Sequence, residues 1–192
     1  MSKKYEITDT IHPYVPRLRR IRALRDIPTV GVKAGDLGGW IESEHNLDHT
    51  GPAWVFDSAR VFGCARVFDS ARVSGSAEVS GSARVSGSAE VSGSARVSGS
   101  AEVFDSAIVQ SSEDIMHSMV LASEQYGATL HRTTDGHLLK VGCWRGTVPE
   151  FRTMIESDEW VEATPDQIKL RRPELLAFTA MCEARIATWE QP

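Results

Sequence analysis

A six-residue alternation of apolar and polar positions dominates the middle of the chain. Valine recurs ten times at this spacing from Val55 to Val109, and an alanine stands two residues before each valine. The central repeats read A-R-V-S-G-S and A-E-V-S-G-S. Residues two apart in a strand point the same way, so Ala and Val face inward and the charged residue between them faces solvent. The Gly-Ser or Asp-Ser pair that follows is typical of a corner, because Gly and Asp adopt a positive φ at low cost. Each hexad therefore predicts one short strand and one corner.

Three hexads would close one triangular coil, and the outward charges test this length. From Arg72 to Glu102 they alternate between Arg and Glu, so the charge pattern repeats every two hexads. In a coil of three hexads, each charge then stacks on an opposite charge about 4.8 Å away. A coil of two or four hexads would instead stack each charged residue on one of the same charge. The pattern predicts a mainly β protein, a left-handed parallel β-helix of hexapeptide repeats with about three coils.

A coil of three hexads also predicts particular neighbours. Glu78 is expected between Arg60 and Arg96, and Arg66 under Arg84 is the one mismatch of like charges. Exposed ion pairs contribute only about 0–1 kcal/mol each, so we expect the ladder to set register more than stability.

The open ends of so short a solenoid need caps, because unpaired strand edges promote aggregation. We expect an N-terminal β cap over residues 1–52, the β-helix over 53–110, and an acidic C-terminal β-hairpin with helices over 111–192. Phenylalanine replaces the outward serine in four hexads, and we expect the caps to cover these rings: Phe56, Phe62, Phe68 and Phe104.

The N-terminal cap is predicted to hold strands at residues 4–8 and 17–24, followed by tight turns over 30–42. The second strand carries five arginines between Arg17 and Arg25. A phosphate contact is one interpretation of this basic strand. A solvated face balanced by nearby acids is the interpretation that we favour. The glycines of 30–42 lack the spacing of a phosphate-binding loop.

The C-terminal segment shows a hairpin signal and helix signals. Asp135-Gly136 predicts a turn within a hairpin over 127–143. Thr147 and Glu150 form a capping box for a helix over about 148–157. A second helix starts at Thr164-Pro165, and Pro173 is expected to end it or to begin the next. A stripe at helical spacing then predicts an amphipathic last helix packed on the hairpin or the last coil: Leu175, Phe178, Cys182, Ile186 and Trp189.

Charge and cysteine content indicate which kinds of site and which cellular location to expect. The chain has 192 residues and a net charge of −5, and residues 110–192 carry thirteen acidic against eight basic groups. We take five of the acidic residues as a candidate partner-binding patch: Glu156, Asp158, Glu159, Glu162 and Asp166. The three cysteines have no metal-ligand spacing. There is no signal peptide and no long apolar run, so we expect a cytoplasmic protein without a membrane contact.

Three stretches together resemble a known group of proteins. They are V-G-V-K-A-G-D-L-G-G-W-I-E-S-E-H-N-L with G-P-A-W-V-F-D-S-A-R-V, the hexad run, and H-R-T-T-D-G-H-L-L-K-V-G-C-W-R-G-T-V-P-E-F. The chain resembles hexapeptide-repeat β-helix proteins encoded by phages and prophages. Their N-terminal entry segment is shared with bacterial YdcK-like proteins, which are loosely called transferases. The resemblance implies a β-helix but no catalytic residue, since the transferase label rests on fold analogy.

Catalytic chemistry has few candidates. Acyltransferases with this fold resemble one another in a general-base histidine near a coil corner and a loop inserted between coils. Here no histidine occurs between His49 and His117, and no insertion interrupts the hexads. His45, His49 and His117 lie near the ends of the run, and we expect them to be non-catalytic. A metal held by three histidines from the coils, as in γ-class carbonic anhydrases, is excluded, as is ice binding, which needs flat arrays of Thr. We assign no catalytic, cofactor or metal-binding residue.

The sequence therefore favours a non-enzymatic binding or scaffold protein of phage type. An antagonist of a host defence protein is the specific form of this hypothesis, and we expect a protein partner in the host cytoplasm. Self-association along the flat faces is expected, and nucleic acid is not. The alternative is an acyltransferase of the hexapeptide-repeat class that uses an acyl-coenzyme A donor.

Overall fold

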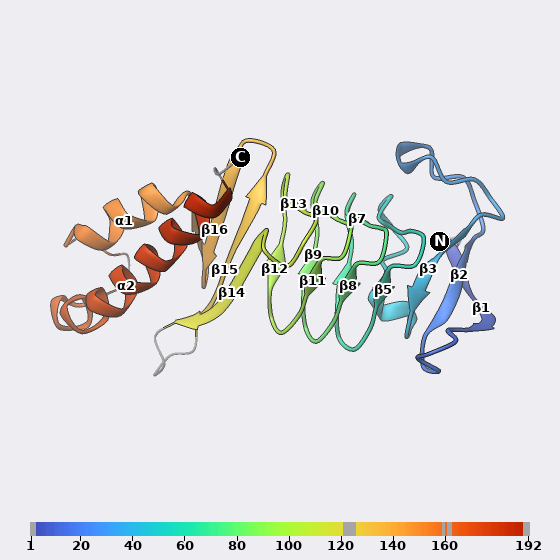
Figure 1. Ribbon diagram of the computed structural model, residues 1–192, viewed down its shortest axis with the longest axis horizontal. Coiled ribbons are helices and arrows are strands. Elements are labelled where there is room, and N and C mark those ends of the chain that lie inside the picture. Colours follow the sequence, from blue (N-terminus) through green and yellow to red (C-terminus); the bar gives the residue numbers. More distant parts are fainter. Residues whose placement is uncertain (1–2, 121–125, 159, 161–162, 190–192) are drawn as a thin grey trace.

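The protein is an elongated rod with a β-helix between two caps (Figure 1). The computed structural model describes residues 3–120, 126–158, 160 and 163–189. A small antiparallel sheet closes the N-terminal end of the rod, and a sheet covered by two helices closes the C-terminal end.

The β-helix consists of ten two-residue strands, one in each hexad. They are β4 (Trp54–Val55), β5 (Arg60–Val61), β6 (Arg66–Val67), β7 (Arg72–Val73), β8 (Glu78–Val79), β9 (Arg84–Val85), β10 (Glu90–Val91), β11 (Arg96–Val97), β12 (Glu102–Val103) and β13 (Ile108–Val109). They form three parallel faces, in the orders β4-β7-β10-β13, β5-β8-β11 and β6-β9-β12. Val79 pairs with Val61 on one side and Val97 on the other. The predicted coil of three hexads is confirmed.

The inside and outside of the coils follow the hexad pattern. Every alanine and valine of the repeats is buried. The corners have positive φ at Gly or Asp, including Asp57 (φ 50°) and Asp69 (φ 57°). These two carboxylates also accept a hydrogen bond from the backbone of the next coil, Asp57 from Gly75 N–H (3.1 Å) and Asp69 from Gly87 N–H (3.2 Å). An aspartate corner therefore links consecutive coils as well as turning the chain.

The N-terminal cap continues one face of the β-helix. Strands β1 (Tyr5–Ile11) and β2 (Arg19–Ala23) confirm the two predicted strands and pair antiparallel. β3 (Leu37–Ile41) pairs antiparallel with β2 and parallel with β5, so it begins a further coil. A short 3-10 turn at Pro28–Val30 lies between β2 and β3, and a second at Glu44–Asn46 lies between β3 and β4. With this entry segment the rod has about four turns.

Part of the segment predicted as tight turns is thus a strand, and its glycines serve close packing. A Cβ on Gly38 would lie 2.6 Å from the Ile21 side chain and 2.7 Å from the Val55 carbonyl oxygen. One on Gly39 would lie 2.6 Å from the Ala59 carbonyl oxygen. The glycines allow β3 to seat directly on the first coil.

Buried polar side chains close the N-terminal end. The Lys4 ammonium is fully buried and donates to the carbonyls of Gly51 (2.9 Å) and Ala53 (2.8 Å). Burial lowers the pKa of Lys4 to about 8. The Tyr5 hydroxyl donates to the Leu47 carbonyl (2.8 Å). The Asn46 amide donates to the carbonyls of two residues in the next coil. Backbone groups that a further coil would have paired are satisfied in this way.

The C-terminal cap holds a four-stranded antiparallel sheet in the order β14-β15-β16-β17. The strands are β14 (Ile115–Val120), β15 (Tyr126–Thr133), β16 (Gly136–Val141) and β17 (Trp144–Gly146). β15 and β16 form the predicted hairpin, with Thr133 opposite Gly136. The outer strands β14 and β17 were not predicted.

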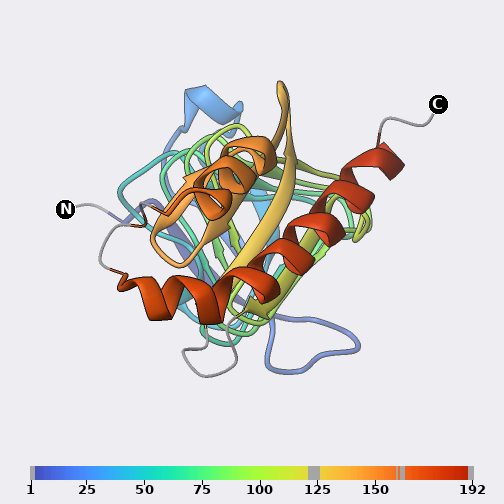
Figure 2. The same cartoon turned by 90° about the vertical axis from the view of Figure 1, so that its left-hand side faces the viewer.

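Two helices cover the side of this sheet that faces away from the coils (Figures 1 and 2). α1 (Val148–Glu156) begins at the predicted capping box of Thr147 and Glu150. α2 (Pro165–Trp189) carries the predicted stripe, of which Leu175, Phe178 and Cys182 are buried in a core shared with the sheet and α1.

The expectation that Pro173 ends a helix is wrong, because α2 runs through it. Proline removes one helical hydrogen bond and crowds the preceding turn, at a cost of about 3 kcal/mol. α2 buries Ile168 before the proline and Leu175 after it, so packing on both sides offsets that cost. The helix changes direction along its length (Figure 2), as expected around an internal proline.

Candidate functional site

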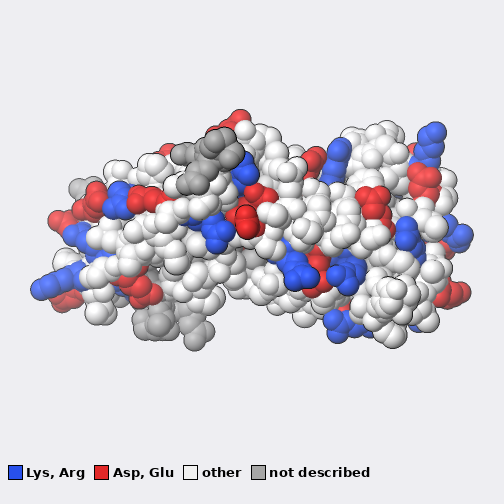
Figure 3. All heavy atoms as spheres, in the orientation of Figure 1, with Lys and Arg blue, Asp and Glu red and all other residues white. Residues whose placement is uncertain are grey.

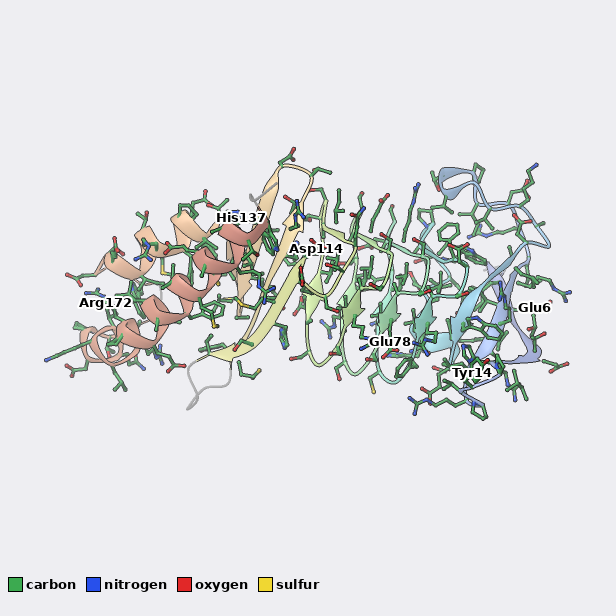
Figure 4. All side chains as sticks on the ribbon, in the orientation of Figure 1. Glu6, Tyr14, Glu78, Asp114, His137 and Arg172 are labelled. Atoms are coloured by element: carbon green, nitrogen blue, oxygen red, sulfur yellow. The ribbon has the colours of Figure 1, made fainter. Side chains whose placement is uncertain are left out.

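Two ion pairs link neighbouring coils on their outward faces. The guanidinium of Arg60 lies 2.8 Å from the Glu78 carboxylate, and that of Arg72 lies 3.6 Å from Glu90. Arg96 stacks on the other side of Glu78. Figure 3 shows this row of basic, acidic and basic side chains across the coils, at the place where Figure 4 labels Glu78. The predicted charge ladder is therefore present on these faces.

His117 is the histidine nearest to a coil corner. It lies on β14, with Nε2 3.2 Å from the Ser100 hydroxyl and Nδ1 3.0 Å from the Thr129 hydroxyl. Burial lowers its pKa, so the ring is neutral at pH 7 and uses one nitrogen as donor and the other as acceptor. A cavity of about 210 Å³ adjoins these residues, lined by Ser100, Thr129, Met119 and Lys140 among others. Nε2 of His117 thus links the C-terminal sheet to the last coil, whereas Nδ1 forms a contact within the sheet.

The two histidines ahead of the first coil differ in exposure. His45 is exposed in the turn at Glu44–Asn46. The His49 ring stacks on Tyr5 with the ring centres 4.2 Å apart, and its Nδ1 accepts a hydrogen bond from Lys4 N–H (3.2 Å). Burial lowers the pKa of His49. His49 therefore belongs to the closure of the N-terminal end.

The candidate acidic patch is partly neutralised by arginines. Glu156 lies 3.4 Å from Arg152, and Asp158 lies 2.7 Å from Arg172. Asp166 is exposed in the first turn of α2. Glu159 and Glu162 lie outside the described residues. Partner binding at this patch stays a prediction.

Two of the four hexad phenylalanines, Phe62 and Phe104, contact charged or aromatic side chains of the caps. The Phe104 ring is buried, with the His131 ring edge-on at 5.0 Å and the Arg145 guanidinium 5.4 Å from its centre. The Arg17 guanidinium lies 4.7 Å from the centre of the Phe62 ring. Phe56 is partly buried against the core of the coils. The Phe68 ring instead lies near Arg66 of its own hexad, at 5.6 Å.

The β1–β2 loop presents an aromatic side chain that no pattern in the sequence indicated. Tyr14 is 88% exposed at the end of the rod (Figure 4). His12 holds the loop, because its Nδ1 accepts hydrogen bonds from Tyr14 N–H and Val15 N–H, each at 3.2 Å. The His12 ring packs edge-on against Trp40 at 4.8 Å, and the Arg20 guanidinium lies 4.9 Å from the centre of Trp40. The exposed tyrosine thus stands on a fixed loop.

Other exposed large apolar side chains also lie on the caps. Among the described residues, those in the N-terminal cap are Ile11, Leu24 and Leu37, and those in the C-terminal cap are Met119, Tyr126, Leu170 and Met181. In the described part of the chain, no large apolar side chain of residues 53–110 is exposed to this degree. The exposed large apolar side chains of the described residues therefore lie on the two caps.

His131 gives the junction of coils and C-terminal sheet a pH dependence. It is fully buried against Phe104, and burial lowers its pKa from 6.5 to about 4. Between these pH values the unfolded chain binds a proton that the folded protein does not. The free energy of unfolding should therefore fall as the pH drops from 6.5 to 4, by about 3 kcal/mol in total from this residue.

The measurement is urea unfolding of the wild type and of His131→Gln at about pH 7 and about pH 4.5. Because the pKa values of His49 and His117 are also lowered, the difference between the two proteins isolates the contribution of His131. Equal losses of stability in both proteins would show that His131 is protonated in the folded state.

Comparisons with known proteins name no family for the chain. No family model matches it, and a search of the curated proteins finds no match. Within the described residues, no group of three or more His, Cys, Asp or Glu side chains is placed to hold a metal ion. Among the helices described, none is long and apolar enough to span a bilayer.

Proposed function

We propose that this protein is a non-enzymatic binding protein of phage type, in which a rigid β-helix holds two recognition caps apart. The observation that carries the proposal is Tyr14, an aromatic side chain 88% exposed on a loop fixed by His12. Tyrosine and arginine are enriched among the residues that dominate binding energy. A loop that is ordered before binding loses little entropy when the partner docks.

The partner that we propose is a host protein, and the support for this is the resemblance of the hexads and their flanking segments to phage-encoded proteins. Antagonism of a host defence protein is the specific form of the proposal. The acidic patch of the C-terminal cap is a second candidate contact, and self-association along the coil faces remains a further prediction.

The test is capture of a stoichiometric partner from a bacterial lysate by the tagged protein, repeated with two variants. Tyr14→Ala should leave the fold intact, because the side chain is exposed, and should reduce the captured partner by about tenfold or more. His117→Ala should leave capture unchanged, because the proposal gives this residue only a structural role. The proposal would be contradicted if the wild-type protein captured no partner, or if the wild type and Tyr14→Ala captured equal amounts.

An acyltransferase is the second candidate function, and the contact between His117 and Ser100 beside a cavity favours it. A neutral histidine within 3.2 Å of a hydroxyl has the geometry of a general base with a nucleophile or acceptor. Acetyl-coenzyme A should then raise the unfolding temperature, and His117→Ala should abolish acyl transfer without unfolding the protein. Our proposal predicts no shift with acetyl-coenzyme A.

A further inference from the structure

The charge ladder breaks on one face of the β-helix. Arg66 on β6 pairs directly with Arg84 on β9, so two guanidinium groups stand on neighbouring strands. Strands in a sheet lie about 4.8 Å apart, and like charges placed directly opposite each other are destabilising. Both side chains are exposed. Within the described residues, neither has a carboxylate within ion-pair distance. Arg60 and Arg72, on the other two faces, each lie within ion-pair distance of a glutamate.

The carboxylate expected to neutralise Arg84 has another partner. Glu102 on β12 is the neighbour of Arg84 on the side away from Arg66. Its carboxylate lies 2.5 Å from the Lys140 ammonium, which comes from β16 of the C-terminal cap. On the other side of Arg66 the chain has the uncharged segment Asn46–Leu47, since Leu47 pairs with Val67. The two arginines therefore lie between an uncharged neighbour and a carboxylate that is already paired.

A hollow of about 240 Å³ lies at the corner that follows β9. Ser86, which points to the same side of β9 as Arg84, lines it together with Phe104, and Lys140 and Arg145 border it from the C-terminal cap. The carboxylates of Asp69, Glu102 and Asp105 line it as well. The Asp69 carboxylate already accepts a hydrogen bond from Gly87 N–H. The hollow is thus of mixed charge, and the unpaired positive charge on this face lies on Arg66 and Arg84.

We propose that Arg66 and Arg84 bind the carboxylates of an acidic segment of the partner protein. The argument is charge complementarity: two guanidiniums on adjacent strands give a bidentate contact to each of two carboxylates. Side chains three or four residues apart on a helix are about 5–6 Å apart, close to the spacing of the strands, so an acidic helix fits the pair. The inference rests on the proposed binding function and assigns it a second contact surface.

The experiment measures binding of a fluorescently labelled alanine-rich helical peptide, with glutamates four residues apart, to the full-length protein at low ionic strength. A peptide with glutamine in place of glutamate is the control ligand. Arg66→Glu should weaken binding of the glutamate peptide by about tenfold and should raise the unfolding temperature, because Glu at this position pairs with Arg84. Arg96→Glu changes the net charge equally on another face. It should keep the affinity and lower the unfolding temperature, because it stacks a second carboxylate on Glu78.

Three results would overturn the proposal. One is equal binding of the glutamate and glutamine peptides. Another is equal loss of affinity in the Arg66→Glu and Arg96→Glu proteins, which would show a response to net charge alone. The third is Arg66-dependent binding of inorganic phosphate without a preference for the glutamate peptide, which would make the pair a site for small anions. These outcomes are independent of the Tyr14→Ala experiment, so failure of the binding function and failure of this surface are distinguishable.

Discussion

Val79→Asp is expected to prevent the coils from closing. Val79 is fully buried and stacks between Val61 and Val97 of the neighbouring coils. An aspartate at this position would place a carboxylate in an interior lined by alanine and valine, with no hydrogen-bond donor from a side chain. An unpaired buried charge costs several kcal/mol, and we expect a loss of more than about 4 kcal/mol in the free energy of unfolding. Circular dichroism during urea unfolding measures it.

Ser80→Asp is the matched control, because it adds the same charge one residue further along and on the outward side. Its effect should stay within about 1 kcal/mol. If Val79→Asp and Ser80→Asp unfold at the same urea concentration, the coil interior is not where the structure places it.

The second large effect is expected at Asp114, in the turn between the last coil and β14. Its side chain accepts hydrogen bonds from Gln110 N–H (2.9 Å) and Ser111 N–H (2.8 Å), and Arg132 of β15 donates to it at 3.1 Å. Burial opposes ionisation, but these donors outweigh it, so the pKa of Asp114 lies below its usual value. Asp114→Ala leaves the two backbone N–H groups without their acceptor, whereas the half-exposed Arg132 can turn to solvent, and the change should cost about 2–4 kcal/mol.

Hydrogen exchange resolved by residue checks this prediction. In the Asp114→Ala protein, amides of β14 and β15 should lose more protection than amides of β5 and β8, because the C-terminal cap detaches before the coils open. Asp135→Ala removes an exposed carboxylate from the hairpin turn of the same sheet, and should leave protection unchanged. Equal protection in the Asp114→Ala and wild-type proteins would show that the turn does not hold the cap.

The coils were predictable because each hexad repeats the same short pattern of apolar and charged residues. The alternation of Ala, charge and Val fixes the inward side, and the charge sequence fixes the length of the coil. The further coil at the N-terminal end was missed because its residues come from β3 and Leu47, which do not follow the hexad pattern. Gly38 and Gly39 look like turn residues in the sequence, and their true role is the close approach of two backbones.

The caps depend on contacts between distant residues, and here the sequence was less informative. The capping box at Thr147 and the turn at Gly136 are local signals, and both were confirmed. The effect of Pro173 was predicted wrongly, because the burial of Ile168 and Leu175 that keeps α2 continuous is tertiary. β14 contains His117 and alternates only weakly, so its pairing with β15 had no clear signal.

The candidate contact surfaces were also predictable only where they depend on local sequence and not on contacts between distant residues. Arg66 over Arg84 was visible in the sequence as soon as the coil length was known. That Lys140 takes the carboxylate of Glu102 could not be predicted, because the two residues meet only when the C-terminal cap docks. The exposure of Tyr14 likewise depends on the fold of its loop, which no pattern in the sequence indicated.

Because the coil is triangular, the number of hexads determines both the distance between the two caps and their relative rotation about the axis of the rod. Adding or removing three hexads would change the separation of the two caps by about 4.8 Å and return the C-terminal cap to the same azimuth. Adding or removing a single hexad would instead rotate that cap by about one third of a turn relative to the N-terminal cap. The number of hexads therefore sets both the reach of the molecule and the relative direction in which its two ends face.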